Sequence, residues 1–236
     1  MIIQPDGDSL LFITQPDHAR LAGETIAHWQ DDGFPTHPRR DVILLAAREH
    51  DNGWTEEDAS THVDEDGTPL DFVSVLVSVR HRIWPRAADR TAARSPYAGA
   101  LIAQHALAVY SSTRSNPGWE EFFRTMTERR DTLLARSGID FETLQQDYAF
   151  VNAADRISLA FCTGWHEPLE SHGRRIILTP QHTVEISPDP FAGARVSLRI
   201  RARRLPRRRF ESSSSLRRAL DDAPVEFLES TAAAMG

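Results

Sequence analysis

A histidine and an aspartate stand side by side at His50 and Asp51, directly after the apolar run of residues 42–47. Adjacent residues of a straight helix do not face each other, but a pair at a helix end can turn toward one metal ion between them. The next two residues, Asn52 and Gly53, favour a turn that ends the helix. The sequence therefore predicts a helix that ends in a His–Asp pair, which is either a solvated helix end or part of a metal site.

Four other residues of the same two types lie on separate predicted segments: His18, His81, His105 and Asp155. A histidine near a helix start or on an apolar helix face is commonly an ordinary surface or core residue, so none of these histidines identifies a site alone. Asp155 is more informative, because its neighbours are apolar and a buried carboxylate is costly unless it is paired or bound to a metal. Imidazole and carboxylate groups together suit Fe, Mn, Zn or Co.

The order of these residues along the chain resembles the HD superfamily of metal-dependent phosphohydrolases, in its version with two metals. The resemblance runs from about residue 15 to residue 165 and is carried by six residues: His18, His50, Asp51, His81, His105 and Asp155. The stretch from residues 15–18 through residues 49–54 also resembles an uncharacterised bacterial branch of that fold, and this second resemblance implies no activity.

The resemblance implies a dinuclear metal site. One ion would be held by four residues: His18, His50, Asp51 and Asp155. The other ion would be held by His81, His105 and a bridging Asp51. Two ions about 3.5–4 Å apart clamp the attacking and leaving oxygens of a phosphoryl transfer and activate a bridging water. His50 and Asp51 would then be catalytic, and Fe or Mn is favoured over Zn, Co and Mg.

The predicted function is that of a metal-dependent phosphohydrolase, which acts on a small phosphorylated or nucleotide-like substrate through a metal-bridged hydroxide. Two alternatives stay open: a di-iron oxygenase of the same fold, and a catalytically inactive metal-binding or sensor module. The weaker candidates for contact with the substrate lie near the proposed ligands or could line a pocket: Arg20, Trp54, Tyr97 and Arg156.

Charge is unevenly distributed along the 236 residues, and the chain has no lysine. Residues 1–71 carry 16 acidic residues against 4 arginines, whereas residues 193–236 carry 10 arginines against 5 acidic residues. The acidic part holds the first three proposed ligands, which suits a cation site and disfavours nucleic acid, whose affinity depends on neutralised phosphates. The arginines of residues 199–209 are explained by a solvated sheet face, with nucleic acid, a phosphate-rich substrate or an acidic partner surface as alternatives.

Cysteine usage and hydropathy indicate the compartment. Cys162 is the single cysteine, which rules out an internal disulfide and favours a reducing cytoplasm. No apolar run approaches the roughly 18 residues of a membrane helix, and the first residues do not form a secretory signal. We therefore expect a cytoplasmic protein with a small-molecule substrate and without a membrane or nucleic-acid partner; a homodimer is compatible with this prediction.

The predicted fold is mainly α. Residues 1–14 should form a β-hairpin, because an Asp-Gly turn signal separates two short apolar runs. Residues 15–170 should form the HD-type helical core, with a helix over 72–84 that rests on the resemblance, since its apolar run would also suit a strand. Residues 171–236 should add strands and terminal helices to the same compact domain. The hairpin and these strands would then form a small antiparallel β appendage.

Overall fold

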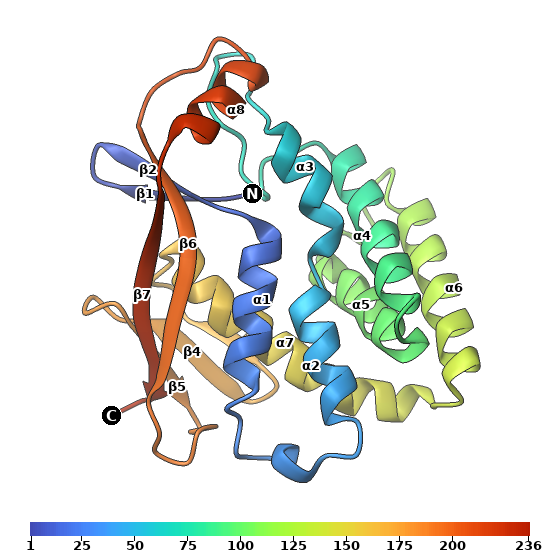
Figure 1. Ribbon diagram of the computed structural model, residues 1–236. Coiled ribbons are helices and arrows are strands. Elements are labelled where there is room, and N and C mark those ends of the chain that lie inside the picture. Colours follow the sequence, from blue (N-terminus) through green and yellow to red (C-terminus); the bar gives the residue numbers. More distant parts are fainter.

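Seven strands form a single mixed sheet in the computed structural model, which describes residues 1–236 (Figure 1). The strands are β1 (Ile2–Asp6), β2 (Ser9–Ile13), β3 (Leu169–Ser171), β4 (Arg174–Leu178), β5 (Thr183–Ser187), β6 (Val196–Pro206) and β7 (Val225–Ala234). Their order across the sheet is β1-β2-β6-β7-β5-β4-β3. Every neighbouring pair is antiparallel except β5 and β7.

The helices lie beside this sheet and beyond it. They are α1 (Gln15–Ile26), α2 (Arg40–Glu49), α3 (Thr55–Ser60), α4 (Val77–Ala92), α5 (Pro96–Val109), α6 (Glu120–Ser137), α7 (Phe141–Thr163) and α8 (Ser213–Asp222), with short 3₁₀ turns η1 (Phe34–Thr36), η2 (Asn52–Trp54) and η3 (Ser111–Thr113). Figure 1 shows α1 and α7 next to the sheet, α2 on the far side of α1, and α4, α5 and α6 farther away. None of the helices combines the length and apolar character that a bilayer crossing requires.

The prediction of a mainly α protein with a small β appendage is wrong. The chain is 50% helical, but 19% of it lies in one seven-stranded sheet. The sheet is large because β6 and β7 are 11 and 10 residues long and pair along most of their length. Residues 225–234 were expected in the terminal helical segments, yet they form β7 between β5 and β6. Pairing on both edges decides the conformation of this alanine-rich segment, since strand preference depends strongly on context.

The predicted hairpin is present as β1 and β2, and its second strand continues the sheet by pairing with β6. The helix expected over residues 72–84 begins only at Val77. The residues before it form a turn, in which the Asp71 carboxylate accepts hydrogen bonds from the backbone N–H groups of Val73 and Ser74. Such side-chain acceptors compete with helical hydrogen bonds and favour a turn.

Two apolar clusters meet at α5. The larger one joins the sheet to α1, α2, α5 and α7, and the smaller one joins α4, α5 and α6 around Trp84, Trp119 and Phe122. The sequence of α5 is apolar on all sides, which is typical of a helix buried in the interior. Only His105 and Gln104 interrupt its apolar middle, so His105 is held at the centre of the protein.

Gly53 sets the distance between η2 and α4. A Cβ atom at this position would lie 2.1 Å from the backbone oxygen of Ile83 and 3.1 Å from the Cβ of Ala87. Gly53→Ala must therefore push η2 away from α4, and overpacking of this kind costs about 2–3 kcal/mol. We expect that loss in the free energy of unfolding, measured with denaturant, while Ser60→Ala on the exposed side of α3 changes it by less than about 0.5 kcal/mol. Equal stability of the two variants would contradict this tight approach.

Candidate metal centre

Five buried side chains converge where α1, α2, α5 and α7 meet: His18, His50, Asp51, His105 and Asp155. None of them is more than 6% exposed. The Thr14 side chain caps α1, which places His18 in its first turn. Helix α2 ends at Glu49, and the backbone of Asp51 has left the helical conformation (φ −107°, ψ 15°). This break allows two adjacent residues, which would diverge within a helix, to point toward the same place.

The three imidazoles direct their Nε2 atoms toward the two carboxylates. His18 Nε2 lies 3.0 Å from Asp155 Oδ1 and 3.9 Å from Asp51 Oδ2. His50 Nε2 lies 3.4 Å from the same Asp155 oxygen and 3.5 Å from Asp51 Oδ2. His105 Nε2 lies 3.9 Å from Asp155 Oδ2. Two overlapping sets of donors could hold a metal ion, and both contain His50: one with His18 and Asp51, the other with His105 and Asp155.

Second contacts fix the orientation of the imidazoles. His50 Nδ1 lies 2.7 Å from the backbone oxygen of Ala47, which can only accept, so this nitrogen carries the proton. The Ser158 hydroxyl donates to the backbone oxygen of His18 and therefore accepts from His18 Nδ1 at 2.8 Å. In both neutral imidazoles the Nε2 lone pair is free to bind a metal. Fixing the tautomer through the opposite nitrogen is the usual device in histidine metal sites.

His50 Nε2 has no hydrogen-bond partner, although its residue is fully buried. Its lone pair faces carboxylate oxygens of Asp51 and Asp155, and this arrangement is repulsive unless a positive charge lies between them. A proton or a metal cation can supply that charge. The donor set therefore fits a metal ion, because such an ion is bound by neutral imidazole and ionised carboxylate together.

The pKa values of the cluster also show that a positive charge is favoured beside its carboxylates. Burial alone would lower the pKa of His50, but the Asp51 and Asp155 carboxylates outweigh it and raise the pKa to about 9. Burial would raise the pKa of Asp155, yet the His18 and His50 imidazoles hold it well below its ordinary value. Burial raises the pKa of Asp51 and lowers the pKa of His105 to about 3. A cation bound between the two carboxylates would offset the burial that disfavours the ionised form of Asp51.

A cavity of about 180 Å³ opens beside the cluster. Its walls include four members of the cluster and several aromatic side chains: His18, Asp51, His105, Asp155, Trp54, Phe72, Trp84, Tyr110 and Trp165. Arg156 is the one positively charged side chain other than histidine in the lining, and its Nε is buried without a hydrogen-bond partner. The cavity therefore combines a wall of potential metal ligands, an aromatic wall and a guanidinium group.

The structure brings together five of the six predicted ligands and places His81 elsewhere. The His81 ring stacks on Phe122 at 5.2 Å between centroids and meets Trp119 edge-on at 5.0 Å. His81 therefore lies on the side of α4 that packs against Trp119 and α6. Its assignment rested on the resemblance alone, because the apolar pattern of this segment does not define a helix face. As a ligand of a second ion, His81 is not supported.

Two of the four residues predicted to contact the substrate line the cavity, and two lie outside it. Trp54 and Arg156 line the cavity beside the cluster. Arg20 instead forms an ion pair with Asp17 at 2.8 Å, outside that cavity. Tyr97 donates a hydrogen bond to Asp147 at 2.6 Å and is also absent from the cavity wall. Arg156, which follows the potential ligand Asp155, therefore lies in the cavity wall, whereas Arg20, two residues after His18, does not.

Sequence reasoning missed two side chains that support the ligands. Ser158 holds His18, and the Tyr148 hydroxyl lies 3.1 Å from His105 Nδ1. Both lie on α7: Tyr148 is seven residues before Asp155, and Ser158 is three residues after it. Residues with these spacings share a helix face. A search along that face for hydroxyl groups would have identified both.

The contact between Ser158 and His18 predicts a measurable effect on metal affinity. Ser158→Ala removes the acceptor of His18 Nδ1–H without touching a ligand atom. Loss of such a supporting contact weakens metal binding by about 10–100-fold, and competition with a chelator would measure it. Ser137→Ala, which removes a helix-surface hydroxyl bonded to the backbone oxygen of Leu134, should leave the affinity unchanged. Equal affinities in both variants would show that His18 does not need Ser158.

Fold and site together define a mixed α/β protein with a buried His/Asp cluster that could hold a metal ion. Residues 1–207 match the model of the DUF3891 family, described as a protein of unknown function, and the chain belongs to this family. Neither the curated proteins nor the solved structures contain a significant match to the chain.

Proposed function

We propose that the cluster binds one divalent transition-metal ion and that the protein is a metal-dependent phosphohydrolase. The observation that carries this proposal is a closed ring of four donors, in the order His18 Nε2, Asp155 Oδ1, His50 Nε2 and Asp51 Oδ2. Successive atoms of the ring are 3.0, 3.4, 3.5 and 3.9 Å apart. Ligands bound tetrahedrally at about 2.1 Å lie about 3.4 Å from one another. The four successive separations of the ring are therefore close to those between ligands of one ion.

One ion, rather than two, agrees with the donors present. The two sets of three donors share His50, whose Nε2 can bind only one ion. A second ion would be left with His105 and the outer oxygen of Asp155, because His81 lies against Phe122 and Trp119. The mixture of imidazole and carboxylate favours Fe or Mn. When bound, such an ion supplies Lewis acidity and an activated water.

The residues around the ring support a small anionic substrate. Arg156 presents a guanidinium with a buried, unpartnered Nε at the cavity wall. Arginine is suited to phosphate because its planar fork donates two parallel hydrogen bonds. The aromatic wall, which includes Trp54 and Trp84, excludes water and strengthens electrostatic contacts inside the cavity. The resemblance to the HD superfamily supports phosphoester hydrolysis as the reaction.

The test begins with elemental analysis of protein purified without added metal and without a His tag. We expect about one equivalent of Fe or Mn, and hydrolysis of p-nitrophenyl phosphate that is lost with a chelator and restored by the metal. Arg156→Gln should raise KM about tenfold or more at unchanged metal content, whereas Arg20→Gln should behave like the wild type.

Three outcomes would reject parts of the proposal. Less than about a tenth of an equivalent of metal after reconstitution would leave a binding or sensor module. Full metal content without hydrolysis of any phosphomonoester or phosphodiester would reject the reaction. Two equivalents of iron with substrate-dependent oxygen uptake would favour the di-iron oxygenase instead.

A further inference from the structure

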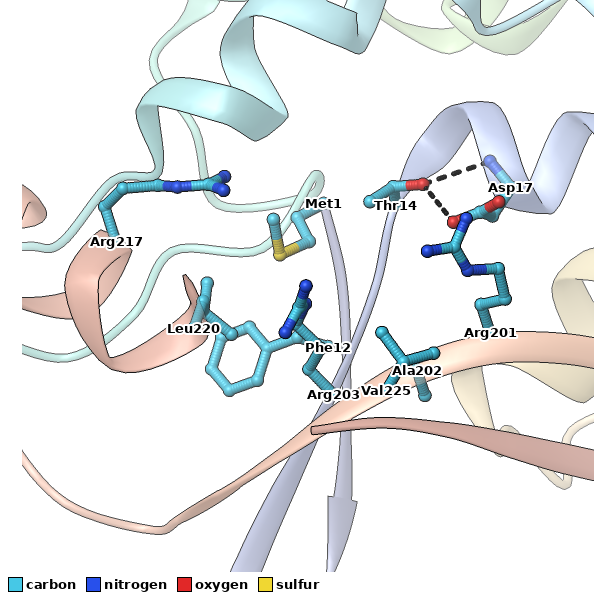
Figure 2. A pocket seen from close by; sticks show the side chains of 10 residues that line it. All are labelled: Met1, Phe12, Thr14, Asp17, Arg201, Ala202, Arg203, Arg217, Leu220 and Val225. Atoms are coloured by element: carbon cyan, nitrogen blue, oxygen red, sulfur yellow. Dashed lines mark hydrogen bonds between the residues drawn. The ribbon is translucent and has the colours of Figure 1, made fainter. Parts of the chain in front are cut away.

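A second cavity, of about 240 Å³, lies between α8, β2, β6 and the first turn of α1 (Figure 2). Its lining joins apolar side chains to arginines from two elements: Met1, Phe12, Thr14, Asp17, Arg201, Ala202, Arg203, Arg217, Leu220 and Val225. It shares no lining residue with the cavity at the metal centre. The two cavities are thus separate sites, although both border α1.

The lining carries more positive than negative charge. Arg201 forms neither an ion pair nor a side-chain hydrogen bond, and Arg203 donates only to the backbone oxygen of Ala223. Asp17 is the one carboxylate in the wall, and it already accepts from Arg20 at 2.8 Å and from the Thr14 hydroxyl at 2.8 Å. Figure 2 shows the Arg201 guanidinium on the side of Thr14 and Asp17, with Arg217 at the opposite end.

The other arginines of β6 show that this excess is local. Arg199 pairs with Glu229 at 3.3 Å, and Arg204 pairs with Glu226 at 3.0 Å and also with Asp6. Strand β7 therefore supplies an acid to each of them. Opposite the two arginines of the cavity it supplies apolar residues instead, since Arg201 faces Phe227 and Arg203 faces Val225 in the register. On β6, Arg201 and Arg203 thus have no ion pair at the place where a cavity can admit an anion.

The apolar part of the cavity restricts the kind of anion. Phe12 and Leu220 are 4% and 2% exposed and form a packed floor with Met1 (Figure 2). A fully hydrated inorganic anion gains nothing from such a floor, whereas an organic molecule buries apolar surface on it. Guanidinium groups favour oxyanions, and two of them match a dianion better than a carboxylate.

We propose that this cavity binds a small amphipathic phosphomonoester. Its phosphate lies against Arg201 and Arg203, and its apolar body lies on the floor formed by Phe12 and Leu220. The site is independent of the metal centre, so the proposal stands or falls separately from the phosphohydrolase function.

The probe for this site is phenylphosphonate, a phosphate analogue that cannot be hydrolysed, titrated calorimetrically into the purified full chain at about 0.15 M salt to screen weak surface attraction. We expect saturable binding of one molecule in His50→Ala, where the metal centre does not compete for the phosphonate, and this binding should weaken about tenfold or more when Arg201→Gln or Arg203→Gln is added. Arg201 forms no ion pair or side-chain hydrogen bond within the protein, so Arg201→Gln should leave the free energy of unfolding nearly unchanged, which denaturant unfolding checks. Arg199→Gln, on the same strand but paired with Glu229, should bind like the wild type.

Four results of such titrations would overturn the proposal. Loss of binding in His50→Ala with retention in Arg201→Gln would place the phosphonate at the metal centre. Equal weakening in Arg199→Gln and Arg201→Gln would indicate general attraction to the arginine-rich strand. Equal affinity for inorganic phosphate would reject the amphipathic class, and binding of phenol as strong as that of phenylphosphonate would reject the role of the arginines.

Discussion

His50→Ala protein should retain less than about a tenth of the metal bound by the wild type, measured by elemental analysis after reconstitution. His50 belongs to both sets of potential ligands, and its Nε2 lies between the carboxylates of Asp51 and Asp155. His18 also faces both carboxylates, but His50 is the imidazole that the two sets have in common. Its removal leaves a pair of donors in each set of three and opens the ring of four, which should weaken metal binding severely. Helical content, followed by circular dichroism, should be largely retained.

A matched variant at another histidine tests whether the loss of metal is specific to a proposed ligand. His81→Phe keeps an aromatic ring against Phe122 and Trp119 and removes both ring nitrogens. It should bind as much metal as the wild type, because His81 lies away from the donor ring. If His81→Phe loses metal as His50→Ala does, the ligand set is wrong and the two-ion arrangement returns. If both variants keep their metal, the ion binds elsewhere.

Five of the six residues selected from the order of residue types along the chain lie together in the structure. His50 and Asp51 could be selected because Asn52-Gly53 ends the helix there, and Asp155 could be selected because its neighbours are apolar. His81 does not join the cluster, and its position was not predictable because its apolar segment has no clear period that would define a helix face. In the structure the turn held by Asp71 delays the start of α4 to Val77, and the His81 ring packs against Trp119 and Phe122.

The sheet could be predicted only in part. Alternation along β6 is visible in the sequence, and the Asp-Gly signal marks the hairpin. Strand β7 has no such signature, because its conformation is imposed by pairing with β5 on one side and β6 on the other. The cavity beside α8 is lined by residues of segments far apart in the sequence, which include Val225 of β7. Its arginines could therefore be noted in the sequence but not distinguished from those of a solvated face.

A second buried network connects the metal centre to the fold. Asp147 is fully buried on α7 and accepts hydrogen bonds from Tyr97 Oη at 2.6 Å and from Arg39 Nη2 at 3.0 Å, with His37 Nε2 at 3.3 Å. Arg39 directly precedes α2, whose other end carries His50. Asp147 lies about two turns before Asp155 on α7. The network thus fixes the start of α2 against the helix that supplies the central carboxylate.

Arg39→Ala should lower the free energy of unfolding by about 3–5 kcal/mol, because it leaves the Asp147 carboxylate buried without its guanidinium. The double variant Arg39→Ala/Asp147→Asn should be more stable than Arg39→Ala, since it removes the orphaned charge while the amide oxygen still accepts from Tyr97. Arg94→Ala breaks a pair with Glu49 in which Arg94 is 63% exposed, so solvent screening limits its effect to about 1 kcal/mol or less. Denaturant unfolding of the three variants measures these differences. If the double variant is no more stable than Arg39→Ala, packing rather than charge holds α2 to α7. In the expected case, metal affinity should recover together with stability, because the same contact positions both His50 and Asp155.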